Sequence, residues 1–384
     1  MSVAHLDQGQ RELLAGIETL AREVFAPIAA AGKPGVINRE LLAALAEHVA
    51  LPRLYGGGSV SAMDLCLIRE GLARHCTEAE TAFALQGLGG YPILLAGRRE
   101  VVDEWIPRIA GGAPAGFALT EPDAGSDAGS LALTATRDGD GFRLHGEKAF
   151  ISNAPDADVY SVFGRTAPEA GSRGITAFAV PGDSPGLTGE PIALLSPHPI
   201  GRLRFEGVFV PDTHVLGEVD NGWRVAMGTL DLFRPSVGAF AVGMAQAALD
   251  AAVAHTASRK AFGRALREFQ AVSHQLAEVA TRLQAARLLV HGAAEAYDRG
   301  AGSSALSAMA KLFATETAQF AVDTAIQVHG ARALEQGHVL EHLYREVRAP
   351  RIYEGASEIQ REIIARDLYR GGAAQHAKPA PNQR

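Results

Sequence analysis

Apolar side chains recur at helical spacing in the first part of the chain. In residues 11–25 four of them lie three or four positions apart: Leu13, Ile17, Leu20 and Val24. This is the spacing of one face of a helix. Residues 39–49 and 62–76 repeat the pattern. Residues 1–113 are therefore predicted to form an N-terminal α-helical domain.

Between residues 114 and 213 the pattern changes to short extended runs. Residues 130–153 contain two such runs joined by two Asp-Gly pairs, which is a hairpin signal. Further runs at 159–166, 174–182 and 202–211 are bounded by Gly and Pro. This texture predicts a middle antiparallel β domain, barrel-like in form.

Helical spacing returns in residues 214–370, now in longer segments. Residues 268–300 end at a glycine and carry one apolar face: Val272, Leu276, Val279, Leu283, Ala286 and Val290. Several such segments predict a C-terminal four-helix bundle. The polar residues 371–384 are predicted to be a disordered tail. The fold class is therefore α+β, in the order helical, β, helical.

Composition narrows the function classes. The net charge is −7 and the pI is near 6.0, so no basic field for nucleic acid or for a membrane surface is expected. Two cysteines, Cys66 and Cys76, indicate a reducing compartment. No uninterrupted apolar run reaches the roughly 18 residues of a membrane span. A cytoplasmic protein is predicted.

Two motifs point to hydrolytic chemistry. Ser184 lies in a G-x-S-x-G match, but a proline follows it and no helical pattern comes next, so a turn is predicted instead of a nucleophile elbow. His338 and His342 have the H-x-x-E-H spacing of a zinc site, with no third ligand evident. A zinc hydrolase stays a distant alternative, and no metal is predicted.

Three other segments have the composition of a phosphate and ring-binding site. Residues 117–130, FALTEPDAGSDAGS, combine glycines with hydroxyls and backbone donors. Residues 148–153, KAFISN, add an aromatic ring and a hydroxyl at a strand end. Residues 258–263, SRKAFG, place an arginine three positions before a phenylalanine, which suits a phosphate beside an aromatic face.

In this order the segments resemble the acyl-CoA dehydrogenase family. The resemblance covers almost the whole chain, from residues 21–30 through 53–58 and TEPDAGSD at 120–127 to RIYEGASEIQREIIAR at 351–366. It implies noncovalent FAD, a homotetramer built as a dimer of dimers, and conversion of an acyl-CoA thioester to the trans-2-enoyl-CoA. It also implies an electron-transferring flavoprotein as the electron acceptor.

The resemblance assigns roles to individual residues. The expected cofactor-binding residues are Phe117, Leu119, Thr120, Ser126, Phe150, Ile151, Ser152, Arg259, Phe262, Gln270, Gln327, Gly330, Ser357 and Glu358. Within this set, residues 259, 262, 270, 327 and 330 would hold the adenine end from a neighbouring subunit, and Ser152 would lie near flavin N5. The expected substrate contacts are Ser126, Asp231, Arg234, Tyr353 and Gly355.

Glu354 is implied to be the base that takes the substrate α proton. A thioester α proton is weakly acidic, so its removal requires a base. A carboxylate in a dry apolar pocket becomes a stronger base. Some family members place the base just before the arginine that matches Arg234, but Phe233 stands there. Taken alone, the eleven residues 351–361 favour a different role for Glu354, that of a cap of the helix that follows.

Several positions depart from the family pattern. Phe150 and Ser152 stand where tryptophan and threonine are usual, and Ala331 and Ala333 replace glycines near the adenine site. The acyl group is left open, so a cyclic, branched or carrier-protein-bound thioester, or the use of oxygen, stays an alternative. The segment Glu80 to Gly97 is expected to line the acyl pocket, with its glycines leaving room for substrate.

Overall fold

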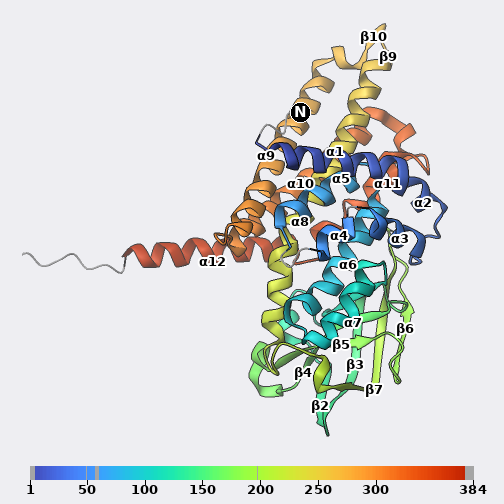
Figure 1. The fold of residues 1–384 in the computed structure, drawn as a ribbon. Helices are drawn as coiled ribbons and strands as arrows, with labels where there is room; N and C mark the ends of the chain where they lie inside the picture. The colour runs from blue at the N-terminus through green and yellow to red at the C-terminus, as the bar shows by residue number, and fades with distance from the viewer. Residues whose placement is uncertain (1–4, 49, 57–59, 197, 377–384) are drawn as a thin grey trace, which may run out of the picture. The chain divides into compact units, whose positions relative to one another are not determined.

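The computed structural model describes residues 5–48, 50–56, 60–196 and 198–376, with side chains described up to residue 370. The chain divides into two compact units, Met1–Phe233 and Arg234–Arg384. Figure 1 colours the chain from blue at the N-terminus to red at the C-terminus. Each unit is described by itself, because their relative positions are not determined.

The first unit begins with helices that match the predicted spacing. They are α1 (Gln8–Leu20), α2 (Ala26–Ala31), α3 (Arg39–Glu47), α4 (Ala50–Tyr55), α5 (Ala62–His75), α6 (Thr77–Ala96) and α7 (Arg99–Ala110). Side-chain caps fix several starts: the Asp7 carboxylate accepts from Gln10 N–H, and the Ser61 hydroxyl accepts from Asp64 N–H. Most residues of helices α5 and α6 are buried, and a buried ion pair between Arg69 and Glu80 joins the two helices.

A sheet completes this unit. Its strands are β1 (Ala115–Ala118), β2 (Thr134–Asp138), β3 (Gly141–Ser152), β4 (Val159–Arg165), β5 (Ile175–Pro181), β6 (Leu187–Pro191), β7 (Ile200–Pro211) and β8 (Val215–Leu216). The order is β6-β7-β3-β2-β4-β5-β8, with β1 beside β4. The predicted Asp-Gly hairpin is confirmed, since β2 and β3 pair antiparallel around it. One face buries an apolar cluster that includes Phe142, Phe178 and Phe205.

The sheet is mixed, so the prediction of an antiparallel, barrel-like domain needs correction. Strand β1 pairs parallel with β4, and β2 meets β4 in parallel at Thr134 and Arg165. A parallel pair needs a long crossover, and residues 119–158 between β1 and β4 contain β2 and β3. The sheet also ends in two separate outer strands, β6 and β8, so it is open.

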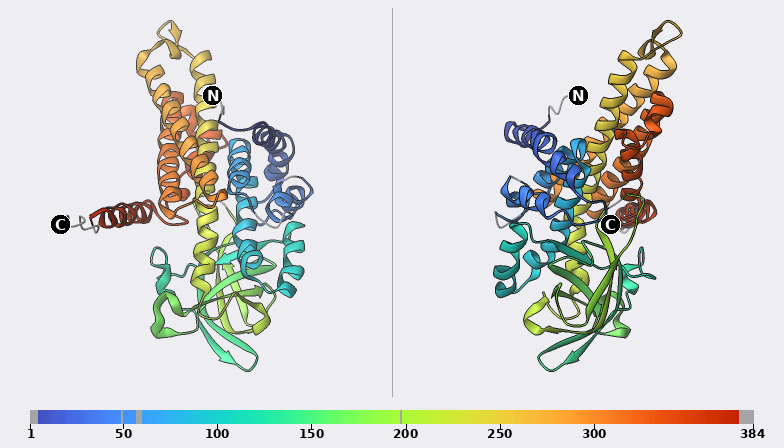
Figure 2. Two further views of the ribbon diagram at one scale, coloured as in Figure 1. Left: turned by 60° about the vertical axis from the view of Figure 1, so that its left-hand side comes forward. Right: turned by 90° about the vertical axis from the view of Figure 1, so that its right-hand side faces the viewer.

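The second unit is helical. Its elements are the later part of α8 (Gly222–Ser258), the hairpin of β9 (Lys260–Ala261) and β10 (Arg264–Ala265), α9 (Gln270–Asp298), α10 (Ser304–His329), α11 (Val339–Glu346) and α12 (Ser357–His376). Helices α9 and α10 run side by side in both views of Figure 2, and α12 packs on α10. The helical, β, helical order is confirmed.

Two boundaries differ from expectation or stay open. Helix α12 continues to His376, beyond the start of the tail predicted to be disordered, whose residues 377–384 lie outside the described part. The predicted domain limits near residues 113 and 213 stay predictions. By length and composition α8 could cross a membrane, contrary to the sequence reading, yet 72% of its apolar window is buried, as in a core helix.

Candidate active site

A buried ion pair shapes the loop between β1 and β2 in the first unit. The Lys148 ammonium donates to the Leu119 carbonyl at 2.9 Å and to the Glu121 carboxylate at 2.8 Å. The same carboxylate accepts from Ala132 N–H at 2.6 Å and Leu133 N–H at 2.9 Å. Glu121 therefore ties the start of the loop to its end. Burial lowers the pKa of Lys148 to about 8, although Glu121 acts in the opposite direction.

This loop carries the predicted flavin contacts of the first unit. The Thr120 carbonyl accepts from Ala149 N–H at 3.0 Å, which fixes the loop on β3. Half-buried Phe117 contacts Phe163 with ring centroids 4.9 Å apart, and Leu119 lies in the core. Ser126 is exposed at the outer part of the loop. The hydroxyls and backbone groups of the loop are thus available on a rigid support.

Strand β3 presents the predicted ring-covering residues at its end. The pairing of β3 with β7 shifts register between Lys148 and Ile151, so Phe150 adopts φ 56° and is 55% exposed. Ile151 is buried, whereas Ser152 is half-buried. The bulge therefore turns an aromatic ring outward beside a hydroxyl.

In the second unit, Glu354 lies on a turn in the left-handed region. Its φ is 51°, and Gly355 follows with φ 90°. The Glu354 residue is half-buried, and its charge acts on the buried ammonium of Lys311. Helix α12 begins at Ser357, and the Ala356 carbonyl accepts from Gln360 N–H at 3.0 Å. Ala356 therefore occupies the cap position, so Glu354 is not the capping residue.

The residues near Glu354 differ in exposure and in their hydrogen-bond partners. Tyr353 is 37% exposed. The buried Ser357 hydroxyl donates to Glu316 on α10 at 2.8 Å. Glu358 is exposed and lies 3.4 Å from Arg361. Both Ser357 and Glu358 therefore have partners within this unit.

The five residues predicted for the adenine end gather at one end of the second unit. Arg259 directly follows α8, Phe262 lies in the hairpin with φ 52° and is 97% exposed, and Gln270 begins α9. Gln327 and Gly330 lie at the end of α10. All five are exposed.

A ring contact shows that these helix ends adjoin. His255 on α8 stacks on His329 of α10 with centroids 4.1 Å apart. Figure 1 shows β9 and β10 at the same end as the start of α9. The sequence-distant residues therefore form one exposed surface.

Asp231 and Arg234, the predicted contacts of the CoA arm, lie one turn apart on α8. Asp231 is half-buried in the first unit, and Arg234 is 6% exposed in the second. The Arg234 charge acts on Lys311, which places it in the same electrostatic environment as Glu354.

The glycines of α6 do not leave room for substrate, contrary to expectation. A Cβ at Gly87 would overlap the Phe233 ring, and one at Gly90 would overlap the Tyr55 hydroxyl. A Cβ at Gly89 would lie 2.5 Å from the Ala115 backbone. Protein atoms therefore fill the space beside each glycine.

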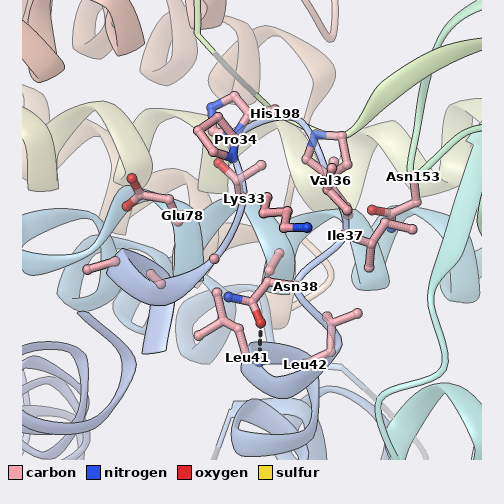
Figure 3. A pocket seen from close by; sticks show the side chains of 17 residues that line it. Lys33, Pro34, Val36, Ile37, Asn38, Leu41, Leu42, Glu78, Asn153 and His198 are labelled. Carbon is pink, nitrogen blue, oxygen red and sulfur yellow. Dashed lines mark hydrogen bonds between the residues drawn. The ribbon is translucent and has the colours of Figure 1, made fainter. Parts of the chain in front are cut away.

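A cavity of about 260 Å³ lies in the first unit, where sequence reasoning indicated none. Figure 3 shows that the segment between α2 and α3, the start of α6, and Asn153 line it. The Asn38 side-chain oxygen Oδ1 caps α3 by accepting from Leu41 N–H at 3.0 Å, and the Asn153 side-chain amide donates to the Ala115 carbonyl at 2.8 Å. These polar groups are engaged in the fold.

The two hydrolytic motifs have structural explanations. The Ser184 hydroxyl donates to the Pro181 carbonyl at 2.7 Å in the turn between β5 and β6, as predicted. His338 caps α11 by accepting from Leu340 N–H at 3.1 Å. Within the described ranges, no group of three His, Cys, Asp or Glu side chains could hold a metal ion.

Comparisons with known proteins agree with this arrangement. The N-terminal, middle and C-terminal domains of acyl-CoA dehydrogenase match residues 7–113, 116–208 and 220–369. The chain belongs to the acyl-CoA dehydrogenase family. It is 36% identical to cyclohexane-1-carbonyl-CoA dehydrogenase of Geobacter metallireducens, over 93% of this chain and 96% of that protein.

Solved structures extend the likeness. Butyryl-CoA dehydrogenase from Megasphaera elsdenii has a TM-score of 0.88 at 30% identity, over 96% of this chain and 100% of that one. A structure of PigA with FAD and proline has a TM-score of 0.90 at 28% identity, over 96% and 99%. The chain is thus an oxidoreductase of this family, and its cofactor is FAD. The fixed loop with its exposed serine, and the outward Phe150 ring, fit that cofactor.

Proposed function

We propose that the protein removes the α proton and the β hydride of an acyl-CoA thioester and forms the trans-2-enoyl-CoA. Glu354 is the base in this proposal. The observation that carries it is the turn: a half-buried carboxylate stands in a left-handed conformation beside a buried lysine, while another residue caps the helix. A residue that only capped the helix would need neither the left-handed conformation nor the buried lysine.

The chain's own residues divide the work. Bound FAD supplies the hydride acceptor that no side chain offers. Thr120, Ser126 and Phe150 hold and cover the flavin, while Asp231 and Arg234 hold the CoA arm. Ile352 and Tyr353 give the base an apolar flank, which favours proton transfer once substrate excludes water. The Glu354 carboxylate then accepts the α proton.

The proposal includes partners. We place the adenine end of FAD on the exposed surface of the second unit, shared with a neighbouring subunit of a homotetramer, a dimer of dimers. Exposed apolar side chains on α9 and α10 support self-association: Leu288, Leu289, Leu306 and Phe313. An electron-transferring flavoprotein takes the electrons. The two buried cysteines, Cys66 and Cys76, are in the reduced form, which supports a cytoplasmic location.

The decisive test compares Glu354→Gln with Glu362→Gln, an exposed α12 control that lies 3.1 Å from Arg366. Flavin bleaching is followed by anaerobic stopped flow with an acyl-CoA that reduces the wild type. Glu354→Gln should keep its FAD and bind acyl-CoA, yet reduce flavin at least about 100-fold more slowly. Reduction within about tenfold of wild type, below what loss of a general base costs, would refute the role.

The same assay separates the alternatives. Cyclic, branched and carrier-protein-bound thioesters are compared with straight-chain acyl-CoA, because proteins similar to this chain include a cyclohexane-1-carbonyl-CoA dehydrogenase and PigA, which has been solved with FAD and proline. Slow reoxidation in air after bleaching supports the dehydrogenase. Rapid reoxidation by oxygen would instead identify an oxidase.

A further inference from the structure

The Glu354 turn is strained, so something must hold it. A non-glycine residue is sterically disfavoured in the left-handed region, and such residues persist where the surroundings fix them. Gly355 continues the left-handed path. A Cβ at Gly355 would lie 2.6 Å from the Gln360 amide nitrogen, so the turn and its neighbours are closely fitted.

Two buried donors meet at one carbonyl of this turn. The Lys311 ammonium donates to the Gly355 oxygen at 2.6 Å, and the Gln360 amide donates to it at 2.8 Å. The Gln360 amide also lies 3.3 Å from the Glu354 carbonyl. Lys311 and Gln360 are both 0% exposed. Fully buried polar groups that converge in this way fix a position strongly.

The ends of the segment are fixed on the same helix. Glu316 of α10 accepts from the Ser357 hydroxyl at 2.8 Å and pairs with Arg351 at 2.9 Å. Lys311 and Glu316 together hold the start, the middle and the end of residues 351–357. Helix α10 is therefore a rigid support for the whole segment.

We infer that Lys311 is a positioning residue for proton abstraction: its ammonium holds the Gly355 carbonyl and so fixes where the Glu354 carboxylate points. This inference rests on the proposed role of Glu354. The positive charge also favours the ionised form of the neighbouring carboxylate. Gln360 donates to the same carbonyl but carries no charge. Variants of Lys311 therefore test position and charge together, whereas variants of Gln360 test position alone.

A purely structural role for Lys311 makes a different prediction. Loss of a buried charge that only stabilises the fold would lower stability and leave the chemistry of the surviving holoenzyme unchanged. A positioning role changes flavin reduction itself. The distinguishing readouts are the limiting reduction rate at saturating substrate and the pH at which that rate is half-maximal on the acid side.

The experiment uses the FAD-loaded protein with an acyl-CoA that bleaches the wild type. Lys311→Met should slow limiting reduction about 10- to 100-fold, the scale of a small misplacement of a reacting group, and should move the acid-side midpoint to higher pH. Lys311→Arg should restore part of the rate. Gln360→Met should slow reduction without moving the midpoint. The exposed α12 control Arg366→Met should match wild type.

Lys311→Met holoenzyme that reduces within twofold of wild type overturns the inference. If Lys311→Met does not fold, Gln360→Met and Lys311→Arg decide, and normal reduction in Gln360→Met overturns it. Glu354→Gln is measured in parallel. Normal flavin reduction by Glu354→Gln refutes the proposed base. Slow reduction by Glu354→Gln, together with normal reduction by the Lys311 and Gln360 variants, refutes only the positioning role.

Discussion

Replacing Lys148 with methionine tests the buried ion pair that fixes the loop between β1 and β2, which carries the predicted flavin contacts. The change removes the ammonium from the Glu121 carboxylate and from the Leu119 carbonyl, both within 2.9 Å. Breaking a buried pair by removing one partner costs about 3–5 kcal/mol, because the other charge is left in the interior. Since Thr120 and Ser126 lie in this loop, FAD affinity should fall together with stability.

A matched exposed pair joins Glu147, the neighbour of Lys148 on β3, to Arg204 on β7. Glu147 and Arg204 are 2.9 Å apart, with their side chains about half exposed, and Glu147→Gln should cost at most about 1 kcal/mol. Both variants are compared by urea unfolding and by fluorescence titration of the apoprotein with FAD. The reasoning is refuted if Lys148→Met unfolds at the same urea concentration as Glu147→Gln and binds FAD equally well.

Two further predictions concern the first unit. Gly87→Ala should lower the unfolding free energy by about 1–3 kcal/mol, because the added methyl overpacks against Phe233. The control Gly16→Ala should not lower it, because no atom lies within 4 Å of the added methyl. Equal melting temperatures for the two variants would contradict this prediction. The Lys148 pKa of about 8 in the folded protein lies below the usual value of 10.5. Between pH 8 and 10.5 the unfolded chain therefore binds more protons than the folded one. The unfolding free energy of wild type, measured relative to Lys148→Met, should rise as the pH increases over this interval. A difference that falls over that interval in urea titrations would show that the sign is wrong.

The order of the elements was predictable because it depends on local signals. Helical spacing, alternation and Asp-Gly pairs act within a few residues, and each was confirmed. The parallel pairing of β1 with β4 was not predictable in this way. Strand β1 has four residues, and its partner follows some 40 positions later in the chain, with no local mark to identify it.

The candidate site likewise combines features with a local sequence signal and features that depend on tertiary contacts. The family resemblance pointed to the segment around Glu354, whose residues alone favoured a helix cap, and the residues that support this segment were missed. Lys311 lies within the apolar residues 308–314 of α10, and Lys148 shares a strand face with Phe142 and Leu144. A lysine at an inward position is a signal that could have identified both. The partners of each lysine depend on tertiary contacts, which the sequence pattern alone does not specify.

The cap and the base readings of Glu354 make opposite demands on the backbone. A cap needs an extended residue immediately before the helix, whose side chain accepts a backbone N–H; that place belongs to Ala356, which has no such acceptor. Glu354 instead occupies a conformation that disfavours its own side chain, and two fully buried donors hold the next carbonyl in place. Because burying an ammonium is costly, a surface cap would gain nothing from this arrangement, whereas a base that must meet one carbon–hydrogen bond requires a fixed direction.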